Sequence, residues 1–161
     1  MKRVCPIQVF CIDETAVFPT KGHETDAGWD ISIVGRDYEK SFSTHARFHT
    51  KLVFVFNDPE LYGELYARSS TAKLGVCLSN NVGIIDPSYR GELLISLASL
   101  ENARNNAHYL NDHKFPIRIA QLIIKRRQYL GTLIKEASLW HEVEKKYLTN
   151  RGAGGFGSTG N

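Results

Sequence analysis

Short apolar runs separated by turn residues constrain the fold of this chain more than any other feature. The runs are rich in Val, Ile, Phe and Tyr, and several alternate apolar with polar residues, which is the period of a half-buried strand. Turn residues recur between them at intervals of roughly ten residues, a spacing typical of β-sandwiches and barrels. The expected strands are Ile7–Ile12, Trp29–Val34, Lys51–Phe56, Leu61–Ala67, Gly75–Leu78, Glu92–Leu97, Ile117–Ile124 and Tyr129–Ile134.

Helical periodicity is scarce, so the sequence predicts an all-β domain with at most one or two short helices. The candidate helices are Ser70–Leu74 and Leu139–Leu148, and the Asn-rich stretch Glu101–Lys114 is expected to be a surface loop. Because 161 residues suffice for one core but not two, we predict a single β domain at residues 1–150. Residues 151–161 are expected to form a flexible glycine-rich arm.

Composition excludes several classes of function. The net charge of +3 is too small to favour nucleic acid as a partner. The cysteines, Cys5, Cys11 and Cys77, are odd in number and form no C-x-x-C pair, which argues against a disulfide framework and for a reducing compartment. No signal region follows the charged start, and no window approaches the roughly 18 apolar residues of a membrane span. We expect a soluble intracellular protein, cytoplasmic or nuclear, that binds neither membranes nor, directly, nucleic acid.

The segment from Arg151 to Asn161 reads Arg-Gly-Ala-Gly-Gly-Phe-Gly-Ser-Thr-Gly-Asn. So many glycines make it costly to order by itself. Yet Arg151, Phe156 and the pair Ser158-Thr159 supply a guanidinium, a flat ring and hydroxyl groups, which suit a nucleotide. A linker has no use for these residues, so we interpret the segment as a nucleotide-binding arm.

Two polar segments adjoin expected strands. Asp26 and Asp30 flank a glycine turn at the mouth of a strand, where an acid can hold a hydrated metal ion or simply belong to the turn. Arg68, Ser69 and Ser70 follow a strand, where they can bind an anion or cap a short helix. Residue types alone leave both alternatives open.

Two further segments combine polar groups with apolar strands. The stretch from Asn80 to Glu92 places an amide, the Asp86 carboxylate and the Tyr89 ring around one turn, and a carboxylate there can deprotonate water. Arg118 and Gln121 interrupt an apolar strand and need polar partners if they are buried. An ion pair or subunit contact is expected for Arg118, and a water or phosphate contact for Gln121.

In this order, these segments resemble the five motifs of the dUTPase family, the deoxyuridine triphosphate nucleotidohydrolases. The resemblance spans residues 27 to 160, and its third and fifth motifs are highly specific. The motifs read Ala27-Gly-Trp-Asp30, Arg68-Ser-Ser70, Gly83-Ile-Ile-Asp86-x-x-Tyr89-Arg-Gly91, Arg118-Ile-Ala-Gln121 and Arg151-Gly-Ala-Gly-Gly-Phe156-Gly-Ser-Thr159-Gly.

The resemblance implies a distorted jelly-roll or β-barrel-like fold and a homotrimer whose active sites are shared between subunits. The implied reaction splits dUTP into dUMP and pyrophosphate, with Mg²⁺ bound on the triphosphate. It limits the incorporation of uracil into DNA and supplies dUMP for thymidylate synthesis. The C-terminal arm is then expected to close over the active site.

Carried over by position, the resemblance implies that Asp86 activates the attacking water and that Tyr89 packs against the deoxyribose, excluding a 2′-hydroxyl. Asn80 and the backbone from 82 to 91 would read uracil. Asp30 would support the hydrated metal ion, and the arm would clasp the γ-phosphate while Phe156 closes over the base. The remaining implied substrate-binding residues are Arg68, Ser69, Ser70, Gly83, Ile85, Gln121, Arg151, Gly157, Ser158 and Thr159.

The chain departs from the family pattern in ways that keep other readings open. The spacing before Gly75 and the pair Asp86-Pro87 are similar to the dCTP deaminases, but the position of their acid/base glutamate is Ser96 here. Pro116-Ile117 replaces the usual glycine and acid before Arg118, and loops such as 101–114 commonly carry partner contacts. A nucleotide-binding regulator or a structural jelly roll is the non-enzymatic alternative.

Overall fold

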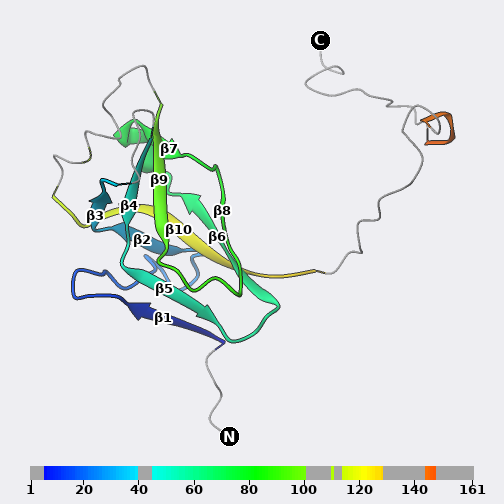
Figure 1. Ribbon diagram of the computed structural model, residues 1–161, viewed down its shortest axis with the longest axis horizontal. Coiled ribbons are helices and arrows are strands. Elements are labelled where there is room, and N and C mark those ends of the chain that lie inside the picture. The colour runs from blue at the N-terminus through cyan, green and yellow to red at the C-terminus, as the bar shows by residue number, and fades with distance from the viewer. Residues whose placement is uncertain (1–5, 40–44, 101–109, 111–113, 129–143, 148–161) are drawn as a thin grey trace, which may run out of the picture. The chain divides into compact units, whose positions relative to one another are not determined.

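The computed structural model describes residues 6–39, 45–100, 110, 114–128 and 144–147. Residues up to Arg127 form one compact unit, which contains all the described strands (Figure 1). A second unit, residues 128–161, is described at Gln128 and in the 3-10 turn η3 (Glu144–Tyr147). The elements of the first unit are β1 (Ile7–Cys11), β2 (Trp29–Ile33), β3 (Gly35–Asp37), β4 (His45–His49), β5 (Leu52–Phe56), β6 (Leu61–Ala67), η1 (Thr71–Leu74), β7 (Val76–Leu78), β8 (Gly83–Ile85), β9 (Leu94–Ser99) and β10 (Ile117–Arg126).

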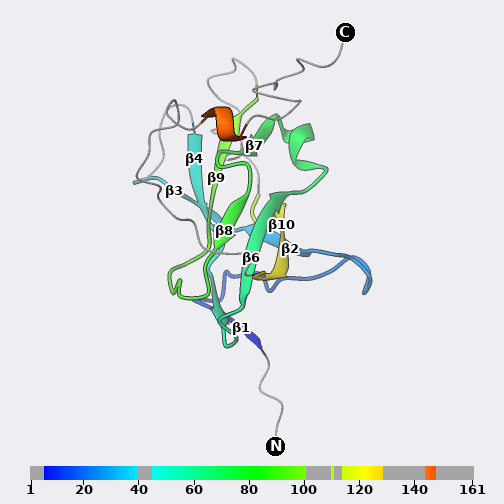
Figure 2. The same ribbon diagram turned by 90° about the vertical axis from the view of Figure 1, so that its right-hand side faces the viewer.

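The strands pair into three sheets with the orders β1-β5, β2-β10-β6-β8 and β3-β4-β9-β7. Every pairing is antiparallel. Neighbours in a sheet are mostly distant in sequence, so the chain crosses repeatedly between the sheets. Figure 2 shows β6, β10 and β2 beside one another, with β4, β9 and β7 in a separate group.

The core forms where the apolar sides of the sheets meet. In β5, Leu52, Phe54 and Phe56 are buried and the residues between them are not, because successive side chains of a strand point to opposite faces. All three sheets contribute to one core cluster, with Ile31 and Leu122 from one four-stranded sheet and residues such as Phe48 and Ile95 from the other. Burial of each such side chain stabilises the fold by about 1.5–3 kcal/mol.

The all-β prediction is confirmed, since the described part of the chain contains strands and short 3-10 turns but no α-helix. The expected helix at Ser70–Leu74 is the 3-10 turn η1, and of Leu139–Leu148 only the turn η3 is described. The expected strand Tyr129–Ile134 lies outside the described residues, as does nearly all of the 101–114 loop. No described helix is long and apolar enough to cross a membrane.

Three predicted strands, those expected to start at Lys51, Gly75 and Glu92, begin too early, and three short strands lay outside the predicted runs. Lys51 precedes β5 because its φ of 59° is left-handed and incompatible with a strand. Glu92 precedes β9, which begins at Leu94. The runs that were not predicted are β3, β4 and β8, of which β3 and β8 have three residues each.

Candidate active site

A pocket of about 310 Å³ opens beside the turn between β8 and β9. The pocket brings together predicted site residues from the third motif and the loop before it, namely Asn80, Gly83, Ile85, Asp86 and Tyr89. Its wall also contains Arg47, Glu92 and Ser96, which the sequence analysis did not assign to substrate binding. One continuous segment therefore supplies most of the pocket's polar groups.

Strand β8 carries the first half of the pocket. Gly83 pairs with Leu65 of β6, and a Cβ on Gly83 would lie 3.3 Å from both Leu65 Cβ and the side-chain nitrogen of Asn80. The missing side chain thus lets Asn80 approach the strand. The side chain of Ile85 is buried in the core, so only its backbone is available to a ligand. Asn81 turns the chain into β8 with a φ of 58°, which Asn tolerates better than most residues.

Asp86 follows β8 directly and is exposed. Its main-chain oxygen accepts a hydrogen bond from the Tyr89 N–H at 3.0 Å, which closes the turn. Its carboxylate makes no hydrogen bond or ion pair within the described part of the chain. The carboxylate is therefore free to accept protons or hydrogen bonds from a ligand or water.

Tyr89 lies on the far side of the same turn, with 46% of its surface exposed. Its hydroxyl donates to the Glu92 main-chain oxygen at 3.0 Å. A Cβ on Gly91 would come within 2.6 Å of Tyr89 Cζ, so the ring occupies the space that a larger residue would fill. The glycine and the hydrogen bond together determine where the ring lies.

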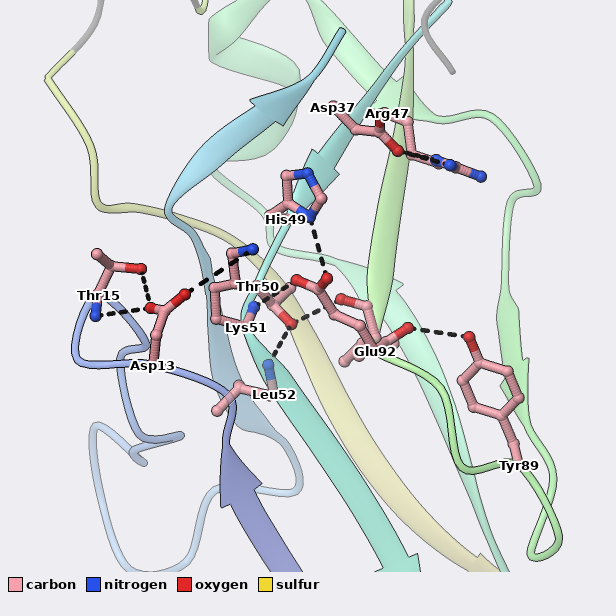
Figure 3. A network of polar contacts seen from close by, with 11 residues as sticks. Asp13, Thr15, Asp37, Arg47, His49, Thr50, Lys51, Leu52, Tyr89 and Glu92 are labelled. Atoms are coloured by element: carbon pink, nitrogen blue, oxygen red, sulfur yellow. Dashed lines mark hydrogen bonds and ion pairs between the residues drawn. The ribbon is translucent and has the colours of Figure 1, made fainter. Parts of the chain in front are cut away.

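The Glu92 side chain joins this turn to the β4–β5 connection (Figure 3). Its Oε2 lies 3.0 Å from His49 Nδ1, and its Oε1 accepts the Lys51 N–H at 2.7 Å. In the same wall, Arg47 Nε donates to Asp37 Oδ2 at 2.8 Å. The Glu92 contacts join residues more than 40 positions apart, and no pattern in the sequence predicts them.

A second cluster gathers predicted residues from the first, second and fourth motifs. Arg68 Nε donates to Asp30 Oδ1 at 2.8 Å, and an Arg118 guanidinium nitrogen lies 3.4 Å from Asp30 Oδ2. Of the two roles expected for Arg118, an ion pair or a subunit contact, the structure shows the ion pair. Ser70 accepts a 3.4 Å hydrogen bond from Arg68, while Ser69 is exposed beside it.

Gln121 belongs to this second cluster through the sheet register. It lies opposite Asp30 on β2, and its side-chain nitrogen donates to the Ala67 carbonyl at 3.3 Å. A Cβ on Gly28 would lie 2.9 Å from Gln121 Oε1, so the glycine is required for this approach. The glycine of the first motif thus makes room for the amide of the fourth.

The two clusters are well separated within one chain. Gly63 of β6 pairs with Ile85, so Asp86 lies level with Tyr62 at the start of that strand. Arg68 follows the other end of β6, and at 3.4 Å per residue its Cα lies roughly 20 Å from that of Asp86. A single phosphate therefore cannot contact both side chains of the same copy.

The predicted site residues of the C-terminal arm cannot be placed beside either cluster. Arg151, Phe156, Gly157, Ser158 and Thr159 lie outside the described residues, so the role of the arm stays a prediction.

Ser96 lines the pocket, and its hydroxyl lies 3.0 Å from that of Ser79. A serine there cannot replace the glutamate that a deaminase needs as acid/base.

Known proteins are similar to this chain over nearly its whole length. A family model described as dUTPase matches residues 14–160. The deoxyuridine 5′-triphosphate nucleotidohydrolase of Clostridium kluyveri is 34% identical over 150 residues, which cover 92% of this chain and 94% of that protein. The enzyme of the same name from Mycolicibacterium vanbaalenii is 30% identical over 155 residues, covering 96% and 94%.

Solved structures show the same fold. The Staphylococcus bacteriophage 80alpha dUTPase with dUpNHpp superposes with a TM-score of 0.68 at 22% identity, over 96% of this chain and 98% of that one. A mutant dUTPase of the S. aureus phage phi11, with a coordinated structural Mg(II) ion, gives 0.64 at 22% identity over 83% and 97%. At this identity the likeness supports the fold alone.

Proposed function

The chain belongs to the dUTPase family, and from this premise we propose how its residues hydrolyse dUTP to dUMP and pyrophosphate. Asp86 carries the proposal, because its exposed carboxylate lines the pocket and makes no bond to any described residue. A general base needs free lone pairs for the water that it deprotonates. Mere nucleotide binding requires no such base, which weighs against a regulator or a structural jelly roll.

In the proposed reaction, Asp86 accepts a proton from water as the water oxygen attacks the α-phosphorus. The bond from the α-phosphorus to the oxygen that bridges to the β-phosphate breaks, and pyrophosphate leaves with that oxygen. A positioned base typically contributes about 10² to 10⁴ in rate. Positioning of the phosphates and neutralisation of their charge provide most of the remainder.

The pocket beside β8 would bind the nucleoside. The Asn80 amide and the backbone from 82 to 91 offer donors and acceptors to the edge of uracil, and the buried side chain of Ile85 restricts its role to the backbone. Tyr89 presents a half-exposed ring, which would pack against the deoxyribose and leave no room for a 2′-hydroxyl. Discrimination against UTP is thus assigned to this ring.

The second cluster would bind phosphate, with Arg68, Ser69, Ser70 and Gln121 as donors. Because this cluster lies roughly 20 Å from Asp86 in the same chain, a neighbouring copy must bring its own cluster to the pocket. This separation supports active sites shared between copies, and the family resemblance implies that the copies form a homotrimer. The C-terminal arm would close each site, with Arg151, Ser158 and Thr159 on the γ-phosphate and Phe156 over the base.

Members of the family depend in general on magnesium, which is proposed to arrive on the triphosphate. No group of three or more His, Cys, Asp or Glu among the described residues is placed to hold a metal. A Mg²⁺ ion on the triphosphate would be held mainly by phosphate oxygens and water, and it would neutralise charge there. Asp30 pairs with Arg68 and Arg118, so it would support the hydrated ion only through its remaining lone pairs.

Turnover of separate nucleotides tests this function. With magnesium, the protein should release pyrophosphate from dUTP far faster than from dCTP, dTTP or UTP. Equal turnover of all four would contradict the assignment of the pocket to deoxyuridine. Release of ammonia from dCTP would favour deamination instead, and the absence of any turnover would favour the non-enzymatic alternative.

A further inference from the structure

Glu92 lies at the end of the turn that carries Asp86 and Tyr89, and its carboxylate is largely buried. The proposed chemistry does not use this group. The Glu92 side chain is 15% exposed, and both its oxygens face the β4–β5 connection rather than solvent. Oε2 lies 3.0 Å from His49 Nδ1, and Oε1 accepts the Lys51 N–H at 2.7 Å (Figure 3). One side chain therefore bridges segments 41 and 43 residues away.

The connection that Glu92 holds is under conformational strain. Lys51 has a φ of 59°, a left-handed conformation that is unfavourable for a residue with a Cβ. Beside it, the Thr50 hydroxyl donates to the Leu93 carbonyl at 2.6 Å, and the Leu93 N–H donates to Leu52 at 2.8 Å. Together with the two contacts of the Glu92 carboxylate, these bonds form a clamp that holds residues 92–93 against residues 49–52.

The clamp holds the residue whose main-chain oxygen accepts the Tyr89 hydrogen bond. The tyrosine hydroxyl donates to this oxygen of Glu92, and the ring lies across Gly91. Asp86, Ser88, Tyr89 and Arg90 are all exposed, so the core does not hold this part of the turn. A shift of Glu92 would move the acceptor of the tyrosine and the ring with it.

We propose that Glu92 is a positioning residue for sugar discrimination: through His49 and Lys51 it fixes the Tyr89 ring in the place that excludes a 2′-hydroxyl. The inference rests on the proposed function, in which this ring contacts the deoxyribose. The ring contacts the sugar in both the ground state and the transition state. Loss of its position therefore raises KM for dUTP and leaves kcat largely unchanged.

The test compares Glu92→Ala with Glu92→Gln and with Glu60→Ala, whose carboxylate pairs with Arg127 away from the pocket. Glu92→Ala should lower the ratio of kcat/KM for dUTP to that for UTP by about tenfold. Glu92→Gln retains an amide oxygen for the Lys51 N–H and should restore most of the ratio. Glu60→Ala should leave it unchanged.

A purely stabilising role would lower the melting temperature of Glu92→Ala without changing the ratio, and that result overturns the inference. If Glu92→Ala does not fold, His49→Ala keeps the Lys51 bond and must show a smaller fall in the same ratio. An unchanged ratio in that variant also overturns the inference. Absence of dUTP turnover by the wild-type chain would instead contradict the proposed function, and the inference with it.

Discussion

The Tyr89 ring lies directly over Gly91, so that a Cβ on Gly91 would come within 2.6 Å of Tyr89 Cζ. Such a distance is impossible without displacement of the ring. We expect Gly91→Ala to raise KM for dUTP and to lower the preference for dUTP over UTP by about tenfold or more, since small displacements in a site are costly. Steady-state kinetics with both nucleotides measures this. Gly35→Ala is the matched control, because a Cβ there meets nothing within 4 Å.

Substitution of the proposed base separates catalysis from binding. Asp86→Asn keeps the shape of the side chain but removes the proton acceptor, so turnover should fall by about 10² to 10⁴. The affinity for a non-hydrolysable imido analogue of dUTP, measured by calorimetry, should stay within a few-fold of wild type. Activity near the wild-type level would exclude Asp86 as the base.

Removal of residues 151–161 tests the arm. A lid that excludes water and positions the phosphates should cost about a hundredfold or more in kcat/KM when it is lost. The control replaces the arm by a Gly/Ser segment of equal length, which lacks Arg151 and Phe156. Full activity of this replacement would show that those side chains have no role.

Thr50 gives a prediction on stability. It is fully buried, and its hydroxyl donates to the Leu93 carbonyl at 2.6 Å and accepts the Leu52 N–H at 3.2 Å. Thr50→Val leaves both groups without this partner, so the free energy of unfolding in urea should fall by about 1–3 kcal/mol. The same change at exposed Thr20, whose hydroxyl makes no hydrogen bond within the described part of the chain, should alter it by less than about 0.5 kcal/mol.

Ionisation of Glu64 should make the stability of the fold depend on pH. Hydrogen bonds from Tyr66, and then from Tyr62, lower the pKa of Glu64 from its ordinary 4.5. The ionised folded form is favoured, so this stabilisation is complete above pH 4.5 and disappears as the pH falls through the folded-state pKa. Tyr66→Phe should therefore lower the urea midpoint at neutral pH, with a difference from wild type that shrinks in acid.

The control for that experiment is Tyr38→Phe, because Tyr38 is 72% exposed and directly follows strand β3, away from Glu64 on β6. Its urea midpoint should follow wild type at every pH. A difference between wild type and Tyr66→Phe that stays constant down to the acid range would show that Glu64 ionisation is not involved.

Much of the fold was predictable because most strands, unlike β3, β4 and β8, are apolar runs bounded by turn residues. The short apolar run Lys51–Phe56 predicted a strand, and the structure decided that Leu52, Phe54 and Phe56 are its buried residues. Errors occur where a distant contact decides the conformation. Lys51 has a left-handed backbone, and its N–H donates to the Glu92 side chain. The residues next to Lys51 in the sequence give no sign of this conformation.

For the site, the sequence determined the turn that carries Asp86 and Tyr89, because its glycines, carboxylate and ring are contiguous. It also determined that the fold is built from strands, since alternation is a local property. Only the tertiary structure decided that Asp30 meets Arg68, that Glu92 meets His49, and that the two clusters lie apart on one sheet. The physical reason is that register and crossovers bring together residues tens of positions apart, and such pairing depends on the packing of the whole core rather than on any local pattern.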